Sequence, residues 1–314
     1  MSLKILRNAA GHILMSRVAG VNKILMREER LKLTWNSIAN VPVVDASNVA
    51  QWNTFFGLSV NSSIFTSVVI TGNDVSLIGG SEITLKDNLF KSNVNLLNVQ
   101  DTGCIIVMGD NCFDSCTSLV SPSFPALILA KNSCFYNCTS LTNPSFPVLA
   151  STGYSCFIGC TGLVSLSFPA LTSVGYYCFY NCRSLVSTSF PALTSAGDDC
   201  FGDCTKLVNP SFPALTSAGN YCFSNCTGLV NPSFPALTSV GYSCFLSCTG
   251  LKNINLPSAI TLGMTVLDDY VFLNITRNII TLTIPAALMT CNAGLPDGDI
   301  QYLMNYNTVT IITV

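Results

Sequence analysis

The chain has 314 residues, of which 49% are hydrophobic and only 10% charged, with a formal net charge of −2. Charged residues make up roughly 25% of an ordinary globular protein, so we expect an apolar core under a surface of Ser, Thr, Asn and Gly. No stretch approaches the ~20 consecutive apolar residues of a spanning helix, which argues against membrane insertion.

Residues 1–64 lack the repeat described below and carry a basic bias. In residues 1–32, seven Lys and Arg face two acids, which leaves about +5, whereas seven bases face fourteen acids in the remainder, which leaves about −7. Such an arm can bind nucleic acid, but interspersed Ile, Leu, Met and Val favour a docking or oligomerisation segment. With Trp35, Trp52 and an expected helix over residues 26–33, we interpret residues 1–64 as an attachment module. The first twenty residues do not resemble a secretory signal peptide.

A repeat of 22 residues begins after this module. Each unit carries a Cys-Phe pair followed three residues after the Phe by a second Cys, and the first Cys residues are Cys112, Cys134, Cys156, Cys178, Cys200, Cys222 and Cys244. A period of 20 to 29 residues with regularly placed Leu and Phe is typical of leucine-rich repeats, in which neighbouring units stack because no single unit can bury its apolar face. We therefore predict a solenoid over residues 65–314, with clear units over 104–263.

One strand per unit is expected where residues 119–124 read LVSPSF. Alternation directs Pro122 and Phe124 inward. It directs two columns outward: Ser121, Asn143, Ser165, Ser187, Asn209, Asn231 and Asn253, and Ser123, Ser145, Ser167, Ser189, Ser211, Ser233 and Asn255. Prolines at the position of Pro122 remove an N–H from the ladder, which predicts weaker pairing in those units.

Two further features predict how each unit turns. Glycines at Gly153, Gly175, Gly197, Gly219 and Gly241 are expected to close a turn with positive φ. The CFxxC segment is expected to form a single helical or 3₁₀ turn. At the carboxyl end, residues 281–291 and 307–314 predict a further strand and a cap, and residues 76–90 predict a degenerate first unit.

The order of residues in GYSCFLSCTGLKNINLPSAITLG, at 241–263, resembles the BspA-like leucine-rich repeats, with Cys in place of the usual Ala before Phe. This resemblance implies an α/β-type superhelix of short parallel strands and short helical turns, capped at both ends. Such repeats occur in surface proteins of gut-associated bacteria, in some protists and in phage proteins. The implied role is adhesion or binding, and the family offers no catalytic residues to carry over.

The cysteines favour a structural interpretation over a chemical one. Stacking places the first and second Cys of every unit in two columns, where small buried side chains fill a narrow corner. Disulfides between stacked neighbours remain possible by distance, although without a leader we expect free thiols. A metal site is least favoured because every CxxxC pair is equivalent. Cys104 and Cys291 lie outside the columns.

Neither catalysis nor cofactor binding is indicated. His12 is the sole histidine and lies in an expected hairpin turn, so a Ser-His or Cys-His nucleophile has no base. Asp198, Asp199 and Asp203 form one local acidic cluster, which a weak Ca²⁺ site could use, but we favour a solvated patch. We predict no catalytic residues, no metal and no cofactor.

Tyrosines give the best indication of function. Seven of the ten lie around the CFxxC segments, where stacking should align them along one edge: Tyr136, Tyr154, Tyr176, Tyr177, Tyr180, Tyr221 and Tyr242. Aromatic side chains with a polar tip are favoured at interfaces, so this tyrosine edge could contact a glycan or a protein, or it could only shield the turns beneath. We predict a non-catalytic structural or binding protein, first a phage virion component (tail, fibre or capsid-associated), alternatively a bacterial cell-surface adhesin. Its partners would be virion proteins or a host-surface protein or glycan, and residues 1–64 would join it to a homo-oligomer or larger assembly.

Overall fold

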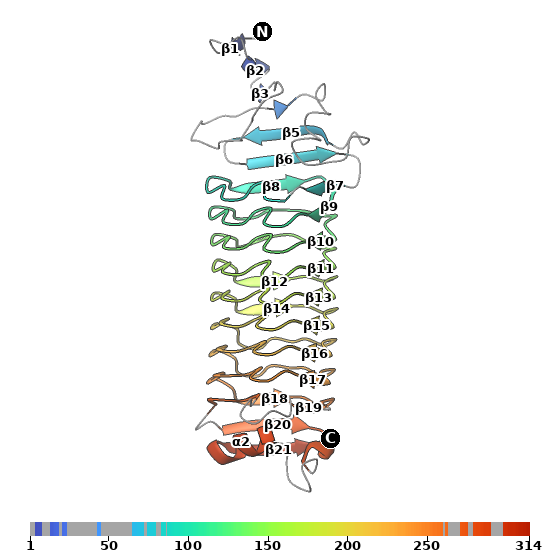
Figure 1. The fold of residues 1–314 in the computed structure, drawn as a ribbon, viewed down its shortest axis with the longest axis vertical. Coiled ribbons are helices and arrows are strands. Elements are labelled where there is room, and N and C mark those ends of the chain that lie inside the picture. Colours follow the sequence, from blue (N-terminus) through green and yellow to red (C-terminus); the bar gives the residue numbers. More distant parts are fainter. Residues whose placement is uncertain are drawn as a thin grey trace.

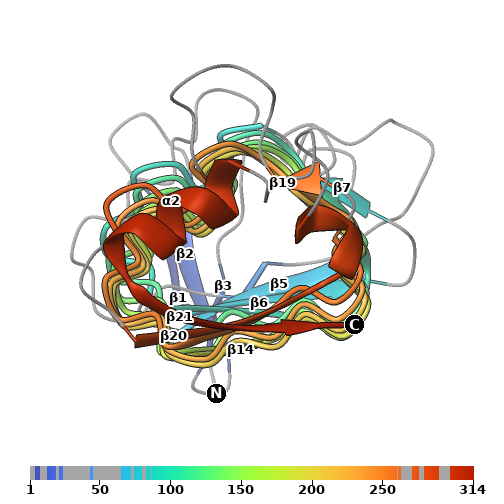
Figure 2. The same ribbon diagram turned by 90° about the horizontal axis from the view of Figure 1, so that it is seen from below.

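The computed structural model describes residues 87–259, 271–275, 279–289 and 298–314, together with the strands at 4–7, 13–18, 21–23, 43–44, 65–71, 74–79, 83–85 and 261–262. The chain winds into an elongated stack of coils, one above the other along a single axis (Figure 1). Seen along that axis, the coils superpose closely (Figure 2). The predicted solenoid is confirmed.

Two small sheets precede the regular coils. β1 (Lys4–Arg7), β2 (Ile13–Val18) and β3 (Val21–Lys23) form an antiparallel sheet at one end of the stack (Figure 1). β4 (Val43–Val44), β5 (Phe65–Thr71), β6 (Asp74–Gly79) and β8 (Asn98–Asp101) form a second sheet, in which β6 and β8 are parallel. The helix expected over 26–33, His12 and Trp35 lie outside the described residues, and the boundary at residue 64 stays a prediction.

A continuous nine-stranded sheet, which the sequence did not predict, runs along one side of the solenoid. Its strands are short and parallel, and from β9 onward partners lie 22 residues apart, as in Ser195↔Ser217. In spatial order they are β7 (Ile83–Leu85), β9 (Ile105–Met108), β10 (Leu129–Ala130), β11 (Ser151–Thr152), β13 (Ser173–Val174), β15 (Ser195–Ala196), β16 (Ser217–Ala218), β17 (Ser239–Val240) and β19 (Thr261–Leu262).

The strand that the sequence did predict forms the adjoining side, and its regularity depends on proline. Full strands occur where the central residue is not proline, in β12 (Ser165–Ser167), β14 (Ser187–Ser189) and β18 (Asn253–Asn255). Single bridges such as Ser123↔Ser145 and Ser211↔Ser233 replace them in units that contain Pro122 or Pro210. The weaker pairing is thus confirmed, because proline supplies no N–H to the ladder.

The third side consists of tight turns, so the expected helical turn is wrong. In each unit the residue before either Cys has positive φ, for example Ser133 at 53° and Asn137 at 53°. Two hydrogen-bonded turns follow one another, with Tyr136 N–H donating to Ser133 O and Cys138 N–H to Phe135 O. A residue with positive φ interrupts a right-handed helix, and Asn and Ser supply it at modest cost.

Glycines in the nine-stranded side do not act as predicted. Within the described residues the positive-φ glycines are Gly103 and Gly159, so the expectation for Gly153, Gly175, Gly197, Gly219 and Gly241 is wrong. Their role is close approach between coils. A Cβ built on Gly175 would lie 2.6 Å from Tyr154 N and 2.7 Å from Gly153 C.

Phenylalanine rings fill the interior in two parallel columns. Phe179 stacks on Phe157 and Phe201 with ring centroids 5.3 Å apart in both cases. It also contacts the second column, at 5.9 Å from Phe168 and 5.5 Å from Phe190. Each unit therefore completes its core only with rings from its neighbours, as expected for a stacked repeat.

The degenerate first unit and the carboxyl end continue the stack. Phe90 stacks on Phe113 at 5.0 Å, which places Phe90 at the end of an aromatic column of the repeats. At the other end β20 (Ile279–Ile284) is the predicted further strand, and β21 (Thr308–Thr313) pairs parallel with it where a cap was predicted; the cap stays a prediction. The 3₁₀ helix η2 (Ala286–Met289) and the helix α2 (Gly298–Tyr306) were not predicted.

Candidate functional site

The seven predicted tyrosines lie on the turn side, where stacking sorts them into three adjacent columns. One column, two residues before the first Cys, holds Tyr154, Tyr176 and Tyr242; the next holds Tyr177 and Tyr221; the third, after the Phe, holds Tyr136 and Tyr180. Three are well exposed, at 54% for Tyr154, 58% for Tyr176 and 43% for Tyr177, and the other four are half-buried. The edge is therefore an aromatic surface that is most open around residues 154–177.

Pairs of tyrosines contact one another within this edge. Tyr177 and Tyr180 pack edge to face with ring centroids 5.8 Å apart. Tyr221 and Tyr242 do the same at 5.0 Å. Edge-to-face geometry is favoured between aromatic rings, so the rings hold each other in defined orientations.

Two of these tyrosines sit on an unfavourable backbone. Tyr177 has φ of 58° and Tyr221 has φ of 54°, at the position that is Ser, Asp or Asn in the other regular coils. Positive φ costs a bulky residue about 1–2 kcal/mol, whereas Asn and Asp adopt it more readily. Such strain is characteristic of functional surfaces.

Aspartate carboxylates lie beside the tyrosines and accept hydrogen bonds from them. These contacts were not predicted from the sequence. Tyr177 hydrogen-bonds to Asp199 of the next coil, and Tyr180 to Asp203. The signal was present in the period, because residues 177, 199 and 221 are 22 apart and share one column. We define the aspartate–tyrosine patch as Tyr176, Tyr177, Tyr180, Asp198, Asp199 and Asp203.

The charges of this patch perturb its own ionisable groups. The Asp199 carboxylate raises the pKa of Tyr177, and the hydrogen bond to Asp203 raises the pKa of Tyr180 to about 12. Burial, together with Asp198 and Asp203, raises the pKa of Asp199, although its bond from Tyr177 acts in the opposite direction. The patch thus gathers negative charge that an incoming cation would stabilise.

Asp198 has a second, structural task. Its Oδ1 accepts a hydrogen bond of 2.8 Å from the backbone N–H of Asn220 in the next coil. Asp110, which occupies the same column four coils earlier, accepts an equivalent bond of 2.9 Å from Asn132. An Asn side chain performs this task too, since Asn132 Oδ1 accepts from Tyr154 N–H at 3.1 Å. The carboxylate charge at Asp198 is therefore not required for stacking.

Comparison with known proteins establishes the family. The model of the BspA type leucine rich repeat region matches residues 83–207 and 172–294, with six copies. The chain belongs to this family. No curated protein is similar enough to count as a relative.

Solved structures resemble this BspA-type protein in fold. A leucine-rich repeat protein from Bacteroides ovatus is 19% identical with a TM-score of 0.54, over 78% of this chain and 67% of that one. A T. pallidum leucine rich repeat protein is 20% identical with a TM-score of 0.43, over 60% and 89%. A leucine rich cell surface protein from Faecalibacterium prausnitzii is 18% identical with a TM-score of 0.36, over 78% and 96%.

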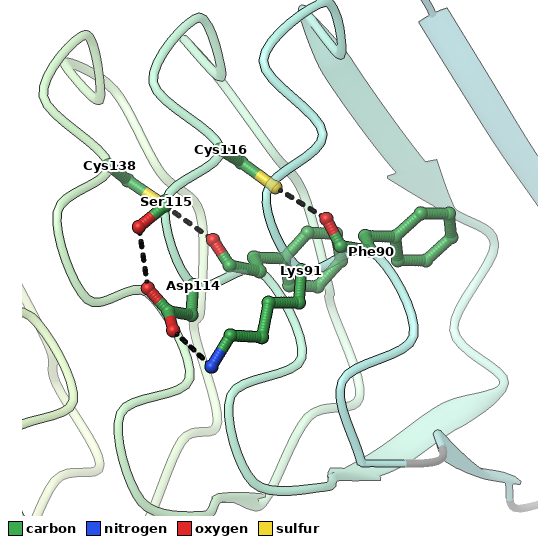
Figure 3. Close-up of polar contacts among 7 residues, drawn as sticks. Phe90, Lys91, Asp114, Ser115, Cys116 and Cys138 are labelled. Carbon is green, nitrogen blue, oxygen red and sulfur yellow. Dashed lines mark hydrogen bonds and ion pairs between the residues drawn. The ribbon is translucent and has the colours of Figure 1, made fainter. Parts of the chain in front are cut away.

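The cysteines of these BspA-type units form a hydrogen-bonded ladder inside the solenoid. Each Cys of the second column donates from Sγ to a Phe carbonyl of the preceding coil, at 2.9 Å for Cys116 to Phe90 and 3.1 Å for Cys138 to Phe113 (Figure 3). The other five are Cys160, Cys182, Cys204, Cys226 and Cys248, at 3.1–3.3 Å. The thiols therefore join adjacent coils as well as fill space.

All fifteen described cysteines are buried, and none of them forms a disulfide with another described cysteine. Among them Cys104, outside the columns, donates to Asp101 Oδ1 at 2.7 Å, whereas Cys291 lies outside the described residues. In the part of the chain that the structure describes, no three His, Cys, Asp or Glu side chains are grouped as metal ligands require. No described helix has the length and apolarity needed to span a bilayer.

Native alkylation tests this interior placement. Burial raises the pKa of Cys116 and of Cys178 to about 12, and thiolate is the reactive form. We expect iodoacetamide at pH 8 to label essentially none of the column thiols in the folded protein, and all of them in urea, as counted by intact mass. Rapid labelling of several column thiols without denaturant would contradict the buried ladder.

Proposed function

We propose that this BspA-type protein is a non-catalytic binding and structural protein, whose tyrosine edge contacts another protein or a host surface. The observation that carries the proposal is that the tyrosine edge is unfavourable for the folded chain by itself. Tyr177 and Tyr221 have positive φ, and Tyr176 and Tyr177 leave 58% and 43% of their surface exposed to solvent. Strained backbone clusters at functional sites, and tyrosine is enriched among the residues that dominate protein interfaces.

The described residues offer little to a chemical reaction. The thiols are buried with no exposed nucleophile among them, and burial raises the pKa of Cys156, Cys160 and Cys182 well above the ordinary range. The patch carboxylates face tyrosines rather than a histidine or lysine. These features support a binding role over catalysis.

For the biological setting we propose a phage virion component, as a tail, fibre or capsid-associated protein. An elongated shaft with a separate sheet, β1 to β3, at one end suits a protein fixed to an assembly by its amino-terminal region (Figure 1). The alternative, a bacterial cell-surface adhesin, is supported by the same exposed edge. Antibody against the chain decides between them: labelling of purified phage particles supports the first, and labelling only of intact bacterial cells overturns it.

Substitution at the exposed tyrosines tests the edge itself. The double variant Tyr176→Ala with Tyr177→Asn should fold, because Asn tolerates positive φ, and its free energy of unfolding should be unchanged or higher by up to about 1 kcal/mol. Incorporation into phage particles should fall at least tenfold, as measured by quantitative mass spectrometry of the purified particles. If the protein is an adhesin, attachment to cells should fall by the same factor.

The control for this experiment removes exposed apolar surface elsewhere. Val164→Ala alters a side chain on the Ser and Asn side of the solenoid. Its incorporation should equal that of the wild type. Equal loss in both variants, or no loss in the tyrosine variant, would discard the tyrosine edge as the binding surface.

A further inference from the structure

We propose that the aspartate–tyrosine patch receives the basic segment of residues 1–32 from a second copy of this chain. The inference rests on the proposed function, because it names the partner of the tyrosine edge. It makes one surface the site of copy-to-copy assembly along the shaft. Charge, aromatic exposure and the place of the two regions in the fold each support it.

No described residue forms an ion pair with the carboxylates of the patch. Asp198, Asp199 and Asp203 come from one coil, and among the described residues the ion pair found is Lys91–Asp114, at 2.8 Å in a distant coil. The positive charge of Arg183 lowers the pKa of Tyr180, but the carboxylates Asp203 and Asp199 raise it by more. Negative charge therefore predominates around this phenol. A cation supplied from outside would therefore gain attraction without displacing an ion-pair partner among the described residues.

The tyrosines make the patch selective for cationic side chains. Tyr177 hydrogen-bonds to Asp199, and the neighbouring Tyr176 is exposed. An ammonium or guanidinium group is attracted to an aromatic face as well as to an anion. Carboxylates and exposed rings also suit sugars. The grouping of three acids favours a cation, because a neutral glycan would leave their mutual repulsion in place.

The chain supplies a segment of the opposite charge. Residues 1–32 contain seven Lys and Arg against two acids, while the rest of the chain is acidic by about seven charges. Residues of β1, β2 and β3 lie within this segment, and Figure 1 places those strands beyond one end of the solenoid. The patch follows β13 and β15, near the middle of the shaft. The geometry therefore favours docking between copies over docking within one copy.

Sedimentation of the full chain tests the proposal. The wild type should self-associate at 50 mM salt and dissociate at 500 mM, since salt screens exposed charges. The variant Asp198→Asn with Asp199→Asn should self-associate about tenfold more weakly at 50 mM salt, because two partly exposed charge contacts are lost. A fluorescent peptide of residues 1–32 should bind the wild-type chain and bind this variant about tenfold more weakly.

Asp110→Asn is the matched control. Asp110 lies in the column of Asp198 and accepts the same backbone hydrogen bond, but it belongs to a coil that has no tyrosine among residues 109–116. Its variant should behave as the wild type in both measurements. Equal weakening by Asp110→Asn would reduce the effect to net charge and overturn the proposal.

Two other outcomes also overturn it, and they can be distinguished from failure of the proposed function. If the wild-type chain stays monomeric at 50 mM salt and does not bind the peptide of residues 1–32, the proposed docking site does not exist. If the Tyr176 and Tyr177 variant nevertheless loses incorporation or attachment, the edge binds a different partner and the proposed function stands. Saturable binding of a neutral oligosaccharide at the patch, lost in the Asn variant, would identify a glycan site instead.

Discussion

Replacing Phe179 with Ala is expected to lower the free energy of unfolding by about 3–5 kcal/mol. The side chain is fully buried and stacks on Phe157 and Phe201 while it contacts the second aromatic column. Its removal leaves a cavity in the centre of the stack, and neighbouring coils cannot collapse into it because their backbones are held in register by the parallel ladders. Urea unfolding followed by circular dichroism measures the loss.

Position along the stack provides the control. Phe90→Ala removes a ring that stacks on one described phenylalanine, Phe113, in the degenerate first unit. We expect its cost to be about half that of Phe179→Ala, because fewer coils lose contact. If both variants lost the same free energy, or if Phe179→Ala cost under about 1 kcal/mol, the aromatic columns would not be the source of cohesion between coils.

Much of the fold was predictable because the repeat period fixes which side chains share a column. Once units of 22 residues stack, Phe124 and Phe146 must lie inward and Ser145 and Ser167 outward, and the structure has them so. The period also predicts where proline weakens strand pairing, because Pro122 recurs as Pro144 and Pro210 in units that form single bridges instead of strands. Periodicity therefore predicts side-chain placement without any knowledge of backbone detail.

Backbone detail was the part that could not be predicted. The nine-stranded sheet uses two-residue strands such as Ser217–Ala218 and Ser239–Val240, too short to show any alternation of polar and apolar residues. Turn geometry was misread for a similar reason. CFxxC spacing suits a helical turn, but the residues before each Cys, such as Asn137 and Asn181, carry positive φ, and only their residue type hinted at it.

In the candidate site, too, the placement of side chains was predictable and their detailed contacts were not. The alignment of the tyrosines followed from the period, but their bonds to Asp199 and Asp203 needed coordinates. Those bonds depend on how the turns orient side chains in adjacent coils, which the period alone does not specify. The strain at Tyr177 is likewise invisible in sequence, because it arises from the two-turn backbone beneath it.

Gly175→Ala should be among the most damaging small substitutions, with an expected loss of about 3 kcal/mol in the free energy of unfolding. Gly175 has no positive φ, so its backbone conformation suits alanine, and the barrier is contact with the preceding coil. The added Cβ would lie 2.6 Å from Tyr154 N and 2.7 Å from Gly153 O. Backbone atoms fixed in a parallel ladder cannot rotate aside, so the two coils must separate. The shift of the urea midpoint measures this cost.

Gly202→Ala is the control, because it distinguishes a collision with the backbone of the preceding coil from crowding among side chains. Its Cβ would meet side-chain atoms instead of backbone, with the Tyr180 ring at 2.9 Å and Ser224 Oγ at 3.2 Å. The half-buried Tyr180 side chain can shift by a few tenths of an ångström more readily than a backbone held in a ladder, so we expect a loss of about 1 kcal/mol. Should Gly175→Ala prove as mild as Gly202→Ala, the glycine column would not set the distance between coils. The larger loss at Gly175 would show that a missing side chain, repeated once per unit, lets these coils approach closely enough to share their aromatic core.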